Sequence, residues 1–123
     1  MKYKLLQRKN PQAPLAAGKW YAVPVHNGKV SQKEIAGEIV GLSSLARGDV
    51  SNVIDSLLDT VPKYLLMGKS INLGGLGTVR LSFSSKGVED PETFNTNLIS
   101  GLKVIFTPSS ELREKIKQVK YEK

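Results

Sequence analysis

The chain contains no cysteine, and this absence removes several classes of site together. Disulfide frameworks, thiolate nucleophiles and cysteine-based zinc sites all require sulfur, so none of them can form, and the absence of cysteine fits a reducing compartment. The chain also has a single histidine, His26. Without a second imidazole or a thiol near it, neither a metal site nor a Ser-His-Asp triad is expected. We interpret His26 as a partly exposed residue beside a turn.

Long hydrophobic runs are missing as well. No stretch approaches the roughly 18 to 20 consecutive apolar residues that a membrane-spanning helix requires. The first ten residues, MKYKLLQRKN, lack the continuous apolar core of a signal peptide. We therefore expect a cytoplasmic protein with no membrane partner.

The 123 residues are enough for one folded domain, and the composition is that of an ordinary globular protein, with 40% hydrophobic and 24% charged residues. We expect a single core over residues 1–123, which a second subunit can complete. Within it we distinguish an N-terminal extension (1–30), a helical base with a first hairpin (31–83), an arm (84–101), and a last strand with a C-terminal helix (102–123).

The excess of positive charge lies at the two ends of the chain. The net charge is +7, and residues 1–30 carry six basic residues and no acidic one. Residues 31–83 are balanced, residues 84–101 hold three acids against Lys86 alone, and residues 102–123 hold six bases against three acids. This distribution favours a polyanionic partner, because each neutralised phosphate releases counterions. The alternative is that scattered lysines only keep a small protein soluble.

The N-terminal extension predicts two short strands. Pro11 and Pro14 interrupt any continuous strand, and Asn27-Gly28 supplies the residues of a closing turn. The run from Trp20 to Val25 predicts burial on both faces of the second strand. We interpret Trp20, Tyr21 and Tyr3 as core residues, with stacking platforms for single-stranded nucleic acid as the alternative.

Two helices are predicted next. Ser31 and Glu34 form a capping-box pattern that starts a helix at Gln32, and Gly41 ends it. Ser43 or Ser44 is expected to cap a longer helix. Pro62 should kink that helix or begin a new last turn, and Gly68 should cap its C-terminus. The longer helix carries its apolar residues at helical spacing: Val50, Val53, Ile54, Leu57, Leu58 and Val61.

The period then changes from helical to alternating, which is typical of strands. We predict a strand over 70–73, a glycine turn over 74–77, a strand over 78–83, an extended excursion over 84–101 and a strand over 102–106. Residues 107–110 should cap a final helix over 111–120. Phe83 and Phe106 lie within the strand patterns, and we expect both in the core.

This order of elements resembles that of the bacterial histone-like HU and integration host factor family. Local motifs support the resemblance: Leu42-Ser43 before the long helix is similar to the family's Gly-Leu-Ser junction, and Gly75-Leu76-Gly77-Thr78-Val79 is similar to its Gly-Phe-Gly-x-Phe signature. Gly68 to Leu73 and Phe106-Thr107-Pro108 with Leu112 also match in order. The resemblance covers residue 31 to about residue 120. It implies an α+β HU-like fold, and the two leading strands look like the addition of a divergent HU-like branch.

The resemblance further implies an intertwined homodimer whose sheets form a saddle over double-stranded DNA. In that family a basic β-arm enters the minor groove and a proline wedges between base steps. Pro91 falls near the place of that proline. The arm of this chain departs from the pattern, because it carries Glu89, Asp90 and Glu92 and only one base, Lys86.

We therefore predict architectural, largely sequence-nonspecific binding of duplex DNA, mainly through phosphate contacts. The candidate DNA-binding residues are Lys2, Lys4, Arg8, Lys9, Gly75, Gly77, Thr78, Arg80, Lys86, Pro91, Lys103, Arg113, Lys115 and Lys117. The alternative is that the HU-like scaffold serves protein–protein assembly, with the acidic arms docking on a basic partner.

No catalysis, cofactor, metal or small-molecule substrate is expected. Gly68-Lys69-Ser70 is not a P-loop, because that motif requires glycine where Lys63 stands. Gly74 to Gly77 joins two strands rather than a strand and a helix, so a dinucleotide site is not indicated. Asp55 and Asp59 lie opposite the apolar stripe of the long helix, where a solvated face explains them.

Overall fold

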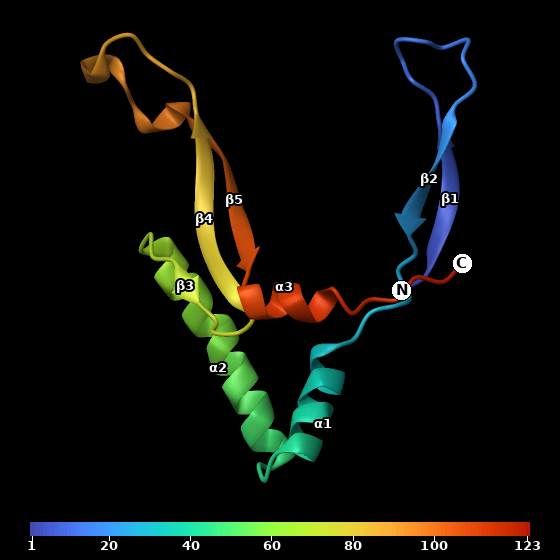
Figure 1. Ribbon diagram of the computed structural model, residues 1–123. Helices are drawn as coiled ribbons and strands as arrows, with labels where there is room; N and C mark the ends of the chain where they lie inside the picture. The colour runs from blue at the N-terminus through green and yellow to red at the C-terminus, as the bar shows by residue number, and fades with distance from the viewer.

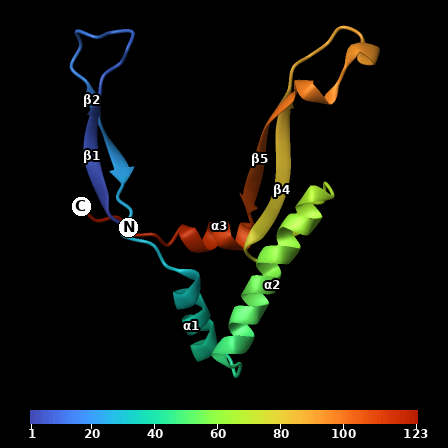
Figure 2. The same cartoon turned by 180° about the vertical axis from the view of Figure 1, so that it is seen from behind.

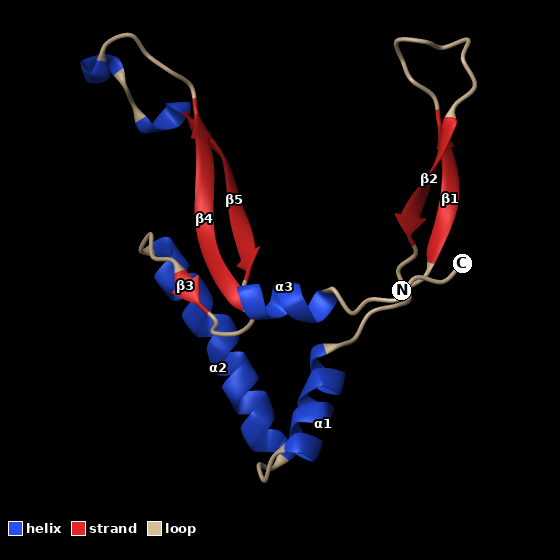
Figure 3. Ribbon diagram, in the orientation of Figure 1, coloured by secondary structure: helices blue, strands red, loops and turns tan.

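The structure, a computed structural model, describes residues 1–123, and its elements follow the predicted order (Figures 1 and 3). They are β1 (Tyr3–Arg8), β2 (Lys19–Pro24), α1 (Gln32–Leu42), α2 (Arg47–Leu66), β3 (Ile71–Asn72), β4 (Gly77–Ser85), the 3-10 turns η1 (Pro91–Thr93) and η2 (Thr96–Leu98), β5 (Ile99–Pro108) and α3 (Ser110–Ile116). Helices α1 and α2 form a V. The β4–β5 ribbon rises beside α2, and the β1–β2 hairpin rises on the other side of the V. No helix is both long enough and apolar enough to cross a membrane.

The β1–β2 hairpin is antiparallel, and its register separates two different faces. Tyr3 pairs with Pro24, Leu5 with Ala22 and Gln7 with Trp20, so these residues share one face. Lys4, Leu6 and Arg8 pair with Val23, Tyr21 and Lys19 on the other face. The prediction that the second strand is buried on both faces is wrong for this chain, because no other element packs on the hairpin and Trp20 is 63% exposed.

The start of the first helix follows the sequence signal, whereas its end lies beyond the predicted Gly41, because α1 runs to Leu42 with Ser43 as its C-cap. Helix α1 begins at Gln32, and the Ser31 Oγ accepts a hydrogen bond from the Glu34 N–H at 3.1 Å.

The predicted N-terminal cap of the second helix, Ser43 or Ser44, is wrong. Helix α2 begins at Arg47 with Ala46 as its N-cap and no capping side chain. Ser43 instead accepts a hydrogen bond from the Leu45 N–H within the connecting turn.

We expect the substitution Ser31→Ala to lower the free energy of unfolding by about 1 kcal/mol, because it leaves the Glu34 N–H without its capping acceptor. Urea unfolding followed by circular dichroism, at one fixed protein concentration, measures this loss. The matched control is Ser44→Ala, which removes a serine hydroxyl that caps neither helix. Equal losses in the two variants would contradict the cap.

Helix α2 ends as predicted, with Gly68 at φ 77°. The Gly68 N–H donates to the Leu65 carbonyl and the Lys69 N–H donates to the Tyr64 carbonyl, which is the Schellman pattern. Pro62 lies inside the helix, and the same element continues beyond it to Leu66. Because proline has no N–H, the Leu58 carbonyl has no i→i−4 donor within the helix at this point.

The three-stranded sheet has the order β3-β4-β5, with antiparallel pairing throughout. Its two long strands extend beyond the predicted bounds, to Ser85 in β4 and from Ile99 in β5. One extra residue in β5 opposite Phe83 forms a bulge, at which Gly101 takes φ 67°.

Helix α3 is shorter than predicted. Ser109 caps it by accepting from the Leu112 N–H at 2.9 Å, but it ends at Ile116 rather than at residue 120. Lys120 and Glu122 instead hydrogen-bond Met1, and Glu122 also pairs with Tyr3, so the C-terminal tail is tied to the foot of the hairpin.

The core within one chain is very small. Ala36, Val50 and Leu65 are the only buried hydrophobic residues, and Val50 is 2% exposed. The prediction that Phe83 and Phe106 are core residues is wrong for the isolated chain, in which they are 56% and 45% exposed. Both lie on the face of the ribbon that carries Val79, Leu81 and Val104, and nothing within the chain covers this face fully. The chain therefore exposes apolar surface that monomeric proteins normally bury.

Candidate nucleic-acid interface

The β4–β5 ribbon has a largely polar face opposite its apolar one, and Ile105, which pairs with Arg80, is an apolar residue on it. The alternation of β4 places Thr78, Arg80 and Ser82 on this face. Lys103 of β5 pairs directly with Ser82, so its side chain lies on the same face as that of Arg80. Both cationic side chains are exposed. The ribbon thus brings the two predicted basic residues of the sheet together, beside hydroxyl groups that can donate to phosphate oxygens.

The β1–β2 hairpin contributes a second basic surface. Lys4, Arg8 and Lys19 lie on one face of the hairpin, around Leu6 and Tyr21, whereas the opposite face has no charged residue. Lys19 was not among the predicted site residues. Its alternation with Tyr21 and its antiparallel pairing with Arg8 are the features that place it there. Lys2 lies just before β1 in a backbone bridge with Glu122.

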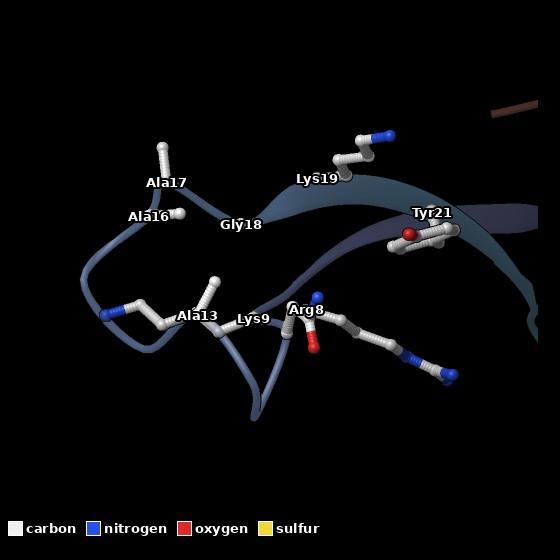
Figure 4. A pocket seen from close by; sticks show the side chains of 9 residues that line it. Arg8, Lys9, Ala13, Ala16, Ala17, Gly18, Lys19 and Tyr21 are labelled. Atoms are coloured by element: carbon white, nitrogen blue, oxygen red, sulfur yellow. The ribbon is translucent and has the colours of Figure 1, made fainter.

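The tip of the hairpin holds a hollow of about 530 Å³ (Figure 4). Small side chains from the loop leave this space open, namely those of Ala13, Ala16 and Ala17. Arg8, Lys9 and Lys19 line the same hollow, and no acidic residue does. The loop is held by hydrogen bonds, among them one from Gln7 Nε2 to the Gly18 carbonyl at 3.0 Å. Figure 4 shows the Arg8 and Lys9 side chains pointing toward opposite ends of the hollow, so the three cations give the whole tip of the hairpin a positive surface.

The arm is not extended throughout, as was predicted for residues 84–101, because it contains the two 3-10 turns η1 and η2. Pro91 is the first residue of the 3-10 turn η1, and the Asp90 carboxylate caps that turn by accepting from the Glu92 N–H at 3.1 Å. Strand pairing stops at Ser85 and Ile99, and Lys86 lies at this point, where its N–H donates to the Leu98 carbonyl. Pro91 is therefore flanked by carboxylates inside a turn, which is a poor setting for a wedge between base pairs.

The glycine turn between β3 and β4 has a packing role. A side chain at Gly77 would meet the Thr107 carbonyl oxygen and lie 2.9 Å from the Phe106 ring, and Gly77 itself is buried. Gly75 lies against the Glu111 carboxylate, and its carbonyl accepts from Ser109 Oγ at 2.6 Å. These contacts explain why both positions are glycine without any bound phosphate. The carboxylate of Glu111 beside Gly75 would repel a phosphate group.

We expect Gly77→Ala to destabilise the fold by roughly 1 to 3 kcal/mol, because the residue has φ 150° and its new methyl group meets the β5 backbone. Thermal unfolding monitored by circular dichroism measures the effect. The matched control is Gly48→Ala in α2, where nothing lies within 4 Å and alanine is expected to stabilise by up to about 1 kcal/mol. If both variants proved equally stable, the packing role of Gly77 would be refuted.

The three cations of α3 are not equivalent. Lys115 forms a salt bridge with Glu111 at 3.3 Å, and Lys117 forms one with Glu114 at 2.8 Å. Arg113 forms no salt bridge. Because exposed pairs of this kind are weak, the lysines can exchange partners, but their local net charge is close to zero. Arg113 is the predicted residue of this helix that offers an uncompensated charge.

Other kinds of site have little support in the structure. No group of three or more His, Asp or Glu side chains is arranged to hold a metal ion. His26 is exposed beside Gly28, which takes φ 83°. Asp55 accepts a hydrogen bond from Gln32 Nε2 at 3.1 Å, so this carboxylate links α2 to α1 on an exposed surface.

The fold of the chain is similar to that of solved HU structures. The chain is similar in fold to the Anabaena HU–DNA cocrystal structure, with a TM-score of 0.58 and 17% identity over 73% of this chain and all of that one. It is also similar to an HU mutant from Thermotoga maritima, with a TM-score of 0.53 and 20% identity over 71% of this chain and 99% of that one. The fold is therefore the α+β fold of HU, as predicted.

A third solved structure extends over nearly the whole chain. It is a bacterial protein from Bacteroides vulgatus, provisionally described as DNA-binding, with a TM-score of 0.64 and 20% identity. The match covers 98% of this chain, so it includes the β1–β2 hairpin. The chain spans 46% of the length of that protein.

Sequence comparison identifies the family. DNA-binding protein HU of Thermotoga maritima is 30% identical over 91 residues, which cover 72% of this chain and the whole of that protein. Residues 1–123 match the family model described as an HU domain fused to wHTH, Ig, or glycine-rich motif. The chain belongs to this HU family, and the predicted resemblance is confirmed.

Proposed function

We propose that this protein binds double-stranded DNA as a homodimer, in an architectural role with little sequence preference. The observation that carries the proposal is the segregation of the β4–β5 ribbon into an apolar face and a face with Arg80, Lys103 and hydroxyl groups. Cations and hydroxyls on a ribbon contact phosphate oxygens, which fixes the position of a protein on DNA without reading its bases. HU of Thermotoga maritima, a DNA-binding protein by name, and the Anabaena HU–DNA complex support this partner.

The exposed apolar surface supports the proposed homodimer. On α2 alone, Val53, Leu57 and Leu58 are all exposed although they lie on the apolar stripe. A second copy related by a two-fold axis can insert its own V of helices against this stripe and bury both surfaces together. The proposed dimer has no catalytic activity and needs no cofactor, and its DNA partner places it at the nucleoid.

The acidic arm favours a second candidate function. Glu89, Asp90 and Glu92 are exposed at the end of the arm, where they repel phosphate and attract basic surfaces. Under this alternative the same scaffold assembles with a basic protein and does not bind DNA. The two functions differ in what the polar face of the ribbon does.

The experiment that separates them changes Arg80 and Lys103 to glutamate together. We expect the affinity for a labelled duplex of about 30 base pairs to fall roughly tenfold for each lost phosphate contact at about 0.1 M salt, because each contact contributes about 0.9 to the salt slope. Fluorescence anisotropy measures the affinity. The control is Lys33→Glu with Lys63→Glu, which lowers the net charge equally on the helices. Equal effects of the two variants would show that the ribbon is not the DNA-binding surface.

A further inference from the structure

The charge-free face of the β1–β2 hairpin has no partner within its own chain. Tyr3, Leu5, Trp20, Ala22 and Pro24 lie on this face, and Gln7 is its one polar residue. A hollow of about 630 Å³ at the foot of the hairpin is lined largely by apolar groups, with Lys2 as its one charged side chain, and is flanked by Tyr121 of the C-terminal tail. An isolated two-stranded hairpin is only marginally stable in water, so we expect this apolar face to be buried against another surface.

The hairpin is nevertheless held in a defined position. The Met1 amino group donates to the Lys120 carbonyl at 2.6 Å, the Glu122 N–H donates to Met1, and the Tyr3 N–H donates to Glu122. These bonds join the foot of the hairpin to the tail that follows α3. The hairpin is thus connected to the sheet in two ways: through α1 and α2 along the chain, and through the tail that follows β5 and α3. The hairpin and the sheet nevertheless stand apart on the two sides of the V of helices (Figure 1).

A two-fold axis brings a suitable surface to the hairpin. Figure 2 shows the chain turned by 180° about the vertical axis, and the β4–β5 ribbon then stands on the side that the hairpin occupies in Figure 1. In the proposed homodimer, a two-fold axis that runs between the two rising elements, parallel to the vertical of Figure 1, puts the ribbon of the second copy on the side of the first copy's hairpin. Both elements rise in the same direction from the helical base.

The ribbon has an uncovered apolar surface to offer. Its upper part extends above the end of α2 in Figure 1. Phe83, near the end of β4, is 56% exposed, and Leu102 beside the bulge of β5 is 66% exposed. The helices of the base end below this part of the ribbon. Phe83 and Leu102 thus present an apolar surface on the side of the ribbon opposite the face that carries the cations.

We infer that the apolar face of the β1–β2 hairpin docks on a second copy of the chain, against the upper part of the partner's β4–β5 ribbon. This inference rests on the homodimer of the proposed function. It assigns the N-terminal extension a role in dimer assembly, and it leaves Lys4, Arg8 and Lys19, on the opposite face, directed away from the contact.

Trp20 is the only tryptophan of the chain and lies on the docking face, so its fluorescence reports the contact without any substitution. We expect emission at shorter wavelength in the dimer, with a shift to longer wavelength on dilution that follows dimer dissociation measured by analytical ultracentrifugation. The control is the double variant Trp20→Phe with Tyr21→Trp, which moves the probe to the opposite face. Its emission should stay at long wavelength at every concentration.

Three results would overturn the inference. If the chain is a dimer and Trp20 emits at long wavelength throughout, the hairpin does not dock, although the dimer of the proposed function stands. If the chain is a monomer at all concentrations, both fail. If the probe at position 21 shifts as much as Trp20, the contact uses the wrong face.

Cysteine cross-linking locates the contact, since the chain has no cysteine of its own. Leu5 and Leu6 are adjacent, equally exposed at 41%, and on opposite faces of the hairpin. When a Leu5→Cys copy is mixed with a Leu102→Cys copy, a short bifunctional thiol reagent should produce a covalent heterodimer. The Leu6→Cys copy should give much less product under the same conditions. Equal yields from Leu5→Cys and Leu6→Cys would place the partner's ribbon elsewhere.

Discussion

We expect a chain in which Lys4, Arg8, Lys9 and Lys19 are all changed to glutamate to bind duplex DNA at least on the order of 10²-fold more weakly at about 0.1 M salt. Three of these residues share one face of the β1–β2 hairpin, and three of them line the hollow at its tip. The salt slope of binding should also become shallower by about 1 for each lost phosphate contact. Because phosphate contacts carry no base readout, the loss should be the same for unrelated duplexes.

The control for this variant must have the same net charge. Changing Lys33, Arg47, Lys63 and Lys69 to glutamate reverses four charges on or next to the helices of the base. We expect this control to bind more strongly than the hairpin variant and to keep most of the salt slope. Anisotropy titrations of both variants at several salt concentrations make the comparison. If the two variants lose affinity equally, only the net charge matters and the hairpin is not part of the interface.

The second large effect is expected from Leu57→Asp in α2. Leu57 lies on the apolar stripe and is 49% exposed in one chain, but the proposed dimer buries it. An unpaired carboxylate in an apolar interface costs several kcal/mol, which is about the size of the whole stability of a small domain. The variant should therefore lose the helical circular dichroism signal or sediment as a monomer at concentrations at which the unmodified chain is a dimer.

Asn52→Asp is the matched control for this substitution. Asn52 is exposed on α2 and falls outside the apolar stripe, so a carboxylate there should change the free energy of unfolding by no more than about 0.5 kcal/mol. In a monomer Leu57 would also be a surface residue, and its substitution would have a similarly small effect. Equal stability of the two variants would thus argue against the homodimer.

The local elements were largely predictable from the sequence because their signals are local. Ser31 with Glu34 located the start of α1, and Gly68 located the end of α2, since each signal acts within one helical turn. The start of α2 was mispredicted for the same reason. Ser43 and Ser44 are good capping residues, but the connecting turn uses Ser43 for the Leu45 N–H, and the helix begins after Ala46.

Features that depend on contacts between distant parts of the sequence could not be predicted from the local hydrophobic pattern. The final helix stops at Ile116 because the tail that follows it pairs with Met1 and Tyr3, at the opposite end of the sequence. Burial was mispredicted for Trp20, Phe83 and Phe106 because an apolar strand pattern indicates that a face will be covered but not which molecule covers it.

The candidate site was predictable in part. Arg80 and Lys103 were placed on the sheet, and the structure adds that they share one face. Lys19 was missed because its role depends on its register with Arg8 across a ten-residue loop. The glycines of the β3–β4 turn were expected to contact phosphate, whereas close packing against Thr107 and Glu111 explains them.

Binding of a labelled duplex by the unmodified chain, measured by anisotropy at several salt concentrations with an unrelated duplex of equal length as the control, tests the proposed function most directly. We predict tight binding to both duplexes that weakens steeply as salt rises, because phosphate contacts dominate. Absence of binding even at low salt would contradict DNA binding and would favour protein assembly through the acidic arms.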